Sequence, residues 1–205
     1  QRGFLRVMGA ASYHLAGYAA MSFSLMAQAE EEANLAPAER AIMRLLLSDL
    51  GTLRGEAETW LRDPDHSDGA LQAVLQEGQG ETDEVFSAIL TTAVYRAFAF
   101  FEFALLTGDA AMNEEAQKTL RGALRVADHV GAVPLWWIIR VALNLIDDLW
   151  ANSLHQVLPE IGPDGAGGYA ELREMFLASL YARKTAEVEL WPSQIGAARR
   201  AIDLT

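Results

Sequence analysis

Helical periodicity is the feature that most restricts how this chain can fold. Apolar residues recur three and four positions apart along nearly all of its 205 residues, and alternating apolar and polar stretches are absent. Hydrophobic residues make up 51% of the sequence, which is enough to bury a core and too much for a disordered chain. The pattern predicts an all-α fold.

Glycine and proline residues divide this pattern into segments. Gly17, Gly108 and Gly131 are expected to end helices, whereas Pro37 and Pro134 are expected at the first helical positions. The segments predict helices over the following approximate ranges: 3–16, 17–32, 37–62, 67–76, 82–107, 113–130, 134–154, 170–184 and 192–203. Residues 159–168 are rich in glycine and proline and are expected to form the one real loop.

Two stretches suggest that helices pair as hairpins. The first has small and large residues at Ala10, Tyr13, Gly17, Ser22, Met26 and Ala29, and the second at Gly108, Ala116, Leu120 and Ala123. This spacing resembles tetratricopeptide-type hairpins, although the full repeat does not recur. We therefore expect an irregular helical-hairpin array or a compact bundle. A stripe of Trp136, Ile139, Leu143, Ile146 and Trp150 should lie in the core.

The composition of the chain argues against several kinds of function. The chain has no cysteine, so it has no disulfide and no thiolate metal site. Its net charge is −12, which makes phosphate binding by the chain alone improbable on electrostatic grounds. Residues 85–107 are long enough to cross a membrane, but Arg96 and Glu102 interrupt them and favour a buried helix. We expect a cytoplasmic domain that does not enter a membrane.

The ionisable residues that could act in catalysis or bind a metal are better explained by structural roles. Asp147 and Asp148 point about 100° apart on a helix, so we expect Asp148 to pair with an arginine or cap a helix and Asp147 to be solvated. The histidines at 14, 66, 129 and 155 lack metal-ligand spacing. We therefore predict no catalytic residue and no metal site in these 205 residues.

The C-terminal segment differs from the rest of the chain. Residues 1–172 carry a net charge of −13, whereas residues 173–205 carry +1. Within the latter, the sequence LWPSQI begins at Leu190 and is followed by Ala197-Ala198-Arg199-Arg200-Ala201. This segment resembles the entry segment of superfamily 2 DEAD/DEAH-box helicases, in which a Pro-x-Gln opens a short helix before the phosphate-binding loop.

The resemblance implies a function for the intact protein. It makes Gln194 the residue that reads the adenine of ATP, because an amide can bond adenine N6 and N7 together. The chain contains no Gly-Lys-Thr loop, so ATP and magnesium would be bound by a motor outside it. The sequence begins at Gln1 without a methionine, and we expect a piece of a longer protein.

The expected organisation follows from this resemblance. Residues 1–158 form a helical accessory domain, residues 159–168 a hinge, and residues 169–205 a helical segment that leads into the motor. The expected partners are the motor in cis and a protein on the acidic helical body, with nucleic acid bound only through the intact parent. The alternative is a self-standing helical-repeat module that binds other proteins.

Overall fold

The computed structural model describes residues 2–30, 34–66, 82–157 and 169–183, together with positions 69, 72 and 196. Within these residues the chain is helical and contains no β-strand, so the all-α prediction is confirmed. The elements are α1 (Arg2–Leu15), α2 (Ala19–Glu30), α3 (Pro37–Leu46), α4 (Leu50–Arg62), the 3₁₀ helix η1 (Pro64–His66), α6 (Thr82–Thr107), α7 (Ala110–Val130), α8 (Val133–Ala151), α9 (Leu154–Val157) and α10 (Tyr169–Tyr181).

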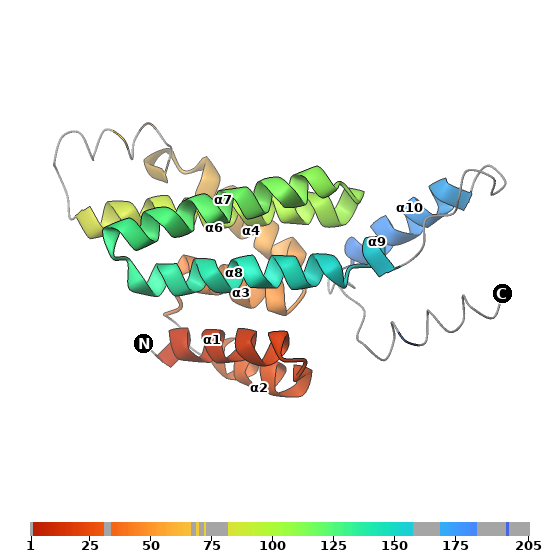
Figure 1. Ribbon diagram of the computed structural model, residues 1–205, viewed down its shortest axis with the longest axis horizontal. Helices are drawn as coiled ribbons and strands as arrows, with labels where there is room; N and C mark the ends of the chain where they lie inside the picture. Colours follow the sequence, from red (N-terminus) through yellow and green to blue (C-terminus); the bar gives the residue numbers. More distant parts are fainter. Residues whose placement is uncertain are drawn as a thin grey trace.

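Neighbouring helices form antiparallel hairpins that stack into an array (Figure 1). Helix α1 pairs with α2, α6 pairs with α7, and α7 pairs in turn with α8. The small and large residues of the predicted hairpin pattern are buried, namely Ala10, Ser22, Met26, Ala29, Ala116, Leu120 and Ala123. Tyr13, the aromatic residue expected to fill the groove between the helices, is 38% exposed and lies against the ring of Tyr18.

The predicted glycine stops are confirmed. Gly17, Gly108 and Gly131 all follow a helix and have φ values of 79°, 74° and 70°. This left-handed conformation closes the last helical turn and is favoured by glycine because it has no Cβ. Pro37 begins α3, as expected.

One predicted helix is wrong, because residues 37–62 form two helices rather than one. The carboxylate of Asp49 accepts the backbone N–H of Thr52 at 3.2 Å and caps the start of α4. Gly51 and Gly55, residues of a type that weakens helices, lie inside α4. Glycine costs a helix only about 1 kcal/mol, and packing of the apolar face of α4 outweighs that cost.

Two other helix ends shift for similar reasons. Helix α7 begins at Ala110 because Asp109 caps it, accepting the N–H of Ala111 at 2.9 Å. Helix α8 ends at Ala151, and residues 154–157 form the separate helix α9. The helices predicted over 67–76 and 192–203, and the loop 159–168, lie outside the described residues except for single positions.

Helix α6 is the centre of the array and contacts α3, α4, α7, α8 and α10. Tyr95, Phe98 and Phe101 are almost completely buried on it. Its length and composition would allow it to cross a membrane, but 61% of its most apolar 18-residue stretch is buried inside the structure. That degree of burial is typical of a core helix.

The aromatic-rich stripe of α8 is partly core. Ile139, Leu143 and Ile146 are buried, as predicted. Trp136 and Trp150 are half-buried and pack against the edge of the same core. A tryptophan is large enough to reach the core and still expose one edge to solvent.

The end of the body is closed by α10. The ring of Tyr181 stacks on that of His155 with centroids 5.4 Å apart, and its hydroxyl accepts the N–H of Leu154 at 3.2 Å. The Nε2–H of His155 donates to the carbonyl of Leu105 at 2.7 Å, and its backbone carbonyl accepts from Arg173. His155 therefore connects the end of α6 to α9 and α10.

We predict that replacing Gly108 by alanine weakens this junction. A Cβ at Gly108 would lie 2.8 Å from Nδ1 of His155, and the φ of 74° already disfavours an L side chain. The left-handed conformation alone should cost about 1–2 kcal/mol. The free energy of unfolding, measured by chemical denaturation, should fall by at least that amount.

The matched control is Gly122→Ala in α7. A Cβ there meets nothing within 4 Å, so the substitution should stabilise the helix by about 1 kcal/mol. Equal stability of Gly108→Ala and the wild type would contradict the role assigned to the turn.

Candidate functional site

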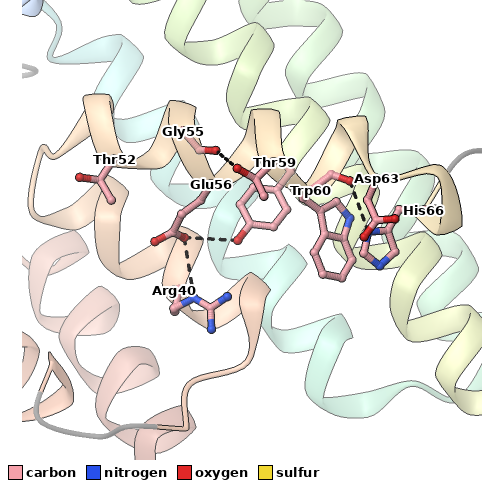
Figure 2. Close-up of a pocket in the computed structure, with 9 residues that line it drawn as sticks. Arg40, Thr52, Gly55, Glu56, Thr59, Trp60, Asp63 and His66 are labelled. Atoms are coloured by element: carbon pink, nitrogen blue, oxygen red, sulfur yellow. Dashed lines mark hydrogen bonds and ion pairs between the residues drawn. The ribbon is translucent and has the colours of Figure 1, made fainter.

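A hollow with polar walls lies along α4. It has a volume of about 520 Å³ and is formed by residues from α3, α4, η1 and α6 (Figure 2). We call it the α4 groove, and its lining residues are Arg40, Thr52, Gly55, Glu56, Thr59, Trp60, Asp63, His66 and Tyr95. These residues lie up to 55 positions apart in the sequence, between Arg40 and Tyr95, and the helix packing brings them together.

One end of the groove is charged. Glu56 lies between two guanidinium groups, with one oxygen 3.8 Å from Nε of Arg40 and the other 3.5 Å from Nε of Arg44. The hydroxyl of Tyr95 donates to the carbonyl of Pro37 at 3.0 Å and lies 3.4 Å from Glu56. Burial raises the pKa of Tyr95 to about 12, and the negative charge of Glu56 acts in the same direction.

The other end is aromatic. The rings of Trp60 and His66 stack with centroids 3.7 Å apart and planes 8° apart. Nε1–H of Trp60 donates to Oγ1 of Thr92 at 3.0 Å, which fixes the indole on α6. Nδ1 of His66 lies 3.5 Å from a carboxylate oxygen of Asp63 and 3.3 Å from the Trp60 carbonyl. This end therefore presents a rigid flat surface beside a carboxylate.

The middle of the groove is open. Thr52, Gly55 and Thr59 follow one another along one face of α4, and a Cβ added at Gly55 would meet nothing within 4 Å. The hydroxyl of Thr59 donates to the carbonyl of Gly55 at 2.8 Å, so it lies back along the helix (Figure 2). A polypeptide or other extended ligand could approach the backbone of α4 closely here.

A second hollow lies on the opposite flank of α4, with a volume of about 370 Å³. Its floor contains the ion pair between Arg54 and Glu102, in which Nε of Arg54 donates at 2.8 Å and Nη2 contacts the same oxygen. The Glu102 side chain is only 8% exposed. The bond to Glu102 raises the pKa of Arg54. Phe103, 50% exposed, lines the same hollow.

The two carboxylates of the groove differ in their surroundings. Both oxygens of Glu56 lie near arginines, whereas Asp63 lies beside His66 and its side chain is 44% exposed. Among the described residues, no group of three or more histidine, aspartate or glutamate side chains could hold a metal ion.

The structure does not describe the residue that the sequence assigned to ATP. Gln194 is outside the described residues, as is the rest of its motif from Leu190 to Ile195. Its role stays a prediction. The one Asp-Glu pair in the sequence, Asp83-Glu84, lies exposed in the first turn of α6, where negative charge stabilises a helix start.

The two aspartates of α8 lie in different electrostatic surroundings. Asp147 is exposed, as predicted, and the charges of Arg121 and Arg140 act on it. Partial burial nevertheless raises the pKa of Asp147. The charge of Asp148 acts on His14 of α1, and its pairing with an arginine stays a prediction. The two carboxylates face different helices.

The groove was missed in the sequence because no local pattern marks it. Trp60 and His66 were visible as an aromatic residue and a histidine, but their stacking depends on the turn at Pro64.

Comparison of the chain with models of known protein families and with curated proteins finds no match.

The buried tyrosines predict a loss of stability in alkali. A pKa of about 12 in the folded protein exceeds the ordinary value of about 10, so folding favours the neutral phenol. The stabilisation is complete below pH 10 and is lost as the pH rises to 12, by about 2–3 kcal/mol for each of Tyr95 and Tyr181. Denaturation at a series of pH values measures it.

Single substitutions separate the contributions of Tyr95 and Tyr181 to this alkaline loss of stability. Tyr95→Phe should reduce the alkaline loss by about half, because Tyr181 still titrates late. Tyr18→Phe is the control, since Tyr18 is 62% exposed and should leave the pH dependence unchanged. An identical alkaline loss in Tyr95→Phe and the wild type would show that Tyr95 does not titrate late.

Proposed function

We propose that this chain is a helical accessory domain joined to the motor of an ATP-dependent nucleic-acid helicase. The observation that carries the proposal is the segment from Leu190 to Ala201, with its Trp191-Pro192-Ser193-Gln194 core. Pro192 would fix the start of a short helix, and Gln194 in its first turn would bond the adenine edge. The motor would supply the phosphate and magnesium ligands.

The attachment of α10 supports this proposal. Leu177, Leu180 and Tyr181 are buried, and Tyr181 is held on His155 by stacking. Helix α10 therefore has a fixed position on the body, and the Gln194 segment follows it in the sequence. A fixed position of α10 would allow the helical body to hold its orientation relative to a motor.

The adenine role of Gln194 can be tested in the longer protein that contains the motor. Gln194→Ala should weaken ATP binding by about 10- to 100-fold, because two base contacts worth about 1–3 kcal/mol are lost. Affinity for GTP should change little, since the triphosphate contacts remain. Nucleotide titration of both variants measures the preference.

Ser193→Ala is the matched control, because it changes the neighbouring residue without removing an amide. It should keep the wild-type preference for ATP. An unchanged preference in Gln194→Ala would reduce the segment to an ordinary helix start and remove the basis of the helicase proposal.

The second candidate function is protein docking, and the α4 groove favours it. An open floor at Gly55, flanked by the ion-paired Glu56 and by the fixed Trp60 and His66 rings, offers contacts of the kinds found in protein interfaces. This function is compatible with the first, since an accessory domain can hold a partner for its motor.

Filling the groove tests the docking function. Gly55→Gln places a side chain on the open floor, whereas Gly51→Gln places one on α4 outside the groove. Both should stabilise α4 slightly, by up to about 1 kcal/mol. Proteins that co-purify with the wild type in its natural cells should be lost with Gly55→Gln and kept with Gly51→Gln. Equal capture by both variants would argue against the groove.

A further inference from the structure

The outer face of α2 has no charged residue. Helix α2 lies at the edge of the array and packs chiefly against α1 (Figure 1). Its inner side buries Ser22, Met26 and Ala29. Its exposed side between Ala19 and Ala29 consists of Ala20, Met21, Phe23, Ser24, Ala27 and Gln28, and we call these residues the α2 face. Phe23 is 64% exposed and Met21 is 49% exposed.

Such a face is unusual for an edge helix. Terminal units of helical arrays normally carry a polar outer surface, and exposed apolar patches on soluble proteins often mark contact sites. Helix α4, which also faces solvent, follows that rule, because it exposes Arg54, Glu58 and Arg62. The α2 face, with no charge and with Met21 and Phe23 exposed, is therefore a candidate contact surface.

We propose that the α2 face is the contact between two copies of this chain, with one α2 antiparallel to the other about a two-fold axis. A two-fold interface brings the same patch of both copies together, so the patch must complement itself. The chain carries a charge of −12, which makes most of its surface repel a second copy. The α2 face is neutral, so two copies can meet there without that repulsion.

The antiparallel orientation follows from the helix dipoles. Parallel α2 helices would bring their two positive amino-terminal ends together, and likewise their two negative carboxyl-terminal ends. In the antiparallel arrangement, the carboxyl-terminal end of each α2 lies beside the amino-terminal end of the other, so that opposite partial charges meet.

The side chains of the face suit close packing. Ala20, Ser24 and Ala27 lie at helical positions i, i+4 and i+7, where small residues let two helix backbones approach. Met21 and Phe23 lie on the two sides of this row and would bury their apolar surface against the other copy. This inference does not depend on the helicase or docking functions.

Sedimentation or light scattering of the 205-residue chain tests the dimer. Between about 1 and about 100 µM, the apparent mass should rise from one chain of 22.4 kDa to two. Phe23→Glu should raise the dissociation constant at least about tenfold, because it buries a charge at the contact. Phe176→Glu is the control, since Phe176 is 56% exposed on α10 and should leave the dimer intact.

A cross-linking measurement decides the geometry even if Phe23→Glu fails to fold. The chain has no cysteine, so Ser24→Cys introduces a single thiol at the middle of the α2 face. A short bis-maleimide should link this thiol to the same thiol of the second chain. Ala111→Cys, exposed on α7, should stay unlinked. A single-chain mass throughout, equal disruption by Phe176→Glu, or no excess linking of Ser24→Cys would each overturn the proposal.

Discussion

The burial of Glu102 inside an apolar helix is the constraint on which the arrangement of α4 depends. Helix α6 packs against α3, α4, α7, α8 and α10, and this carboxylate has an 8% exposed side chain. A buried charge is tolerated only where a partner and hydrogen bonds compensate its lost hydration. Arg54 supplies both from α4. The position of α4 across α6 is therefore set by one ion pair together with the apolar contacts of Leu50, Leu53 and Ala57.

The two hollows beside α4 follow from that position. Helix α4 contacts α6 and α3, and a hollow lies on each of its flanks. On one flank Trp60 reaches across to Thr92 and Glu56 to Tyr95, so the walls of the groove are side chains that also hold α4 in place. The residues that would meet a ligand are thus fixed by the fold and need little ordering on binding.

The sequence predicted what local chemistry controls. Gly108 and Pro37 specify backbone conformations directly, so the helix ends at these residues could be read without any tertiary contact. The break between α3 and α4 could not, because it depends on the cap at Asp49 while the two nearby glycines signal a break elsewhere. The groove was beyond prediction for a further reason. It exists only where Arg40, Trp60 and Tyr95 come together, and no periodicity links residues on three separate helices.

Two ends of the helical body differ in the kind of contact they can make. At α10 the chain is held by directional hydrogen bonds. The Tyr181 hydroxyl accepts the N–H of Leu154, and the His155 ring donates to the carbonyl of Leu105. Directional bonds fix orientation, which is what a connection to a following segment requires. At α2 the exposed surface is uncharged and partly apolar, so its contacts depend mainly on area and shape. The first kind of contact suits the proposed connection to a motor, whereas the second suits the proposed association with a self-complementary surface. If both proposals hold, the distribution of charge and apolar surface along the array would separate the connection to the motor from the contact between copies.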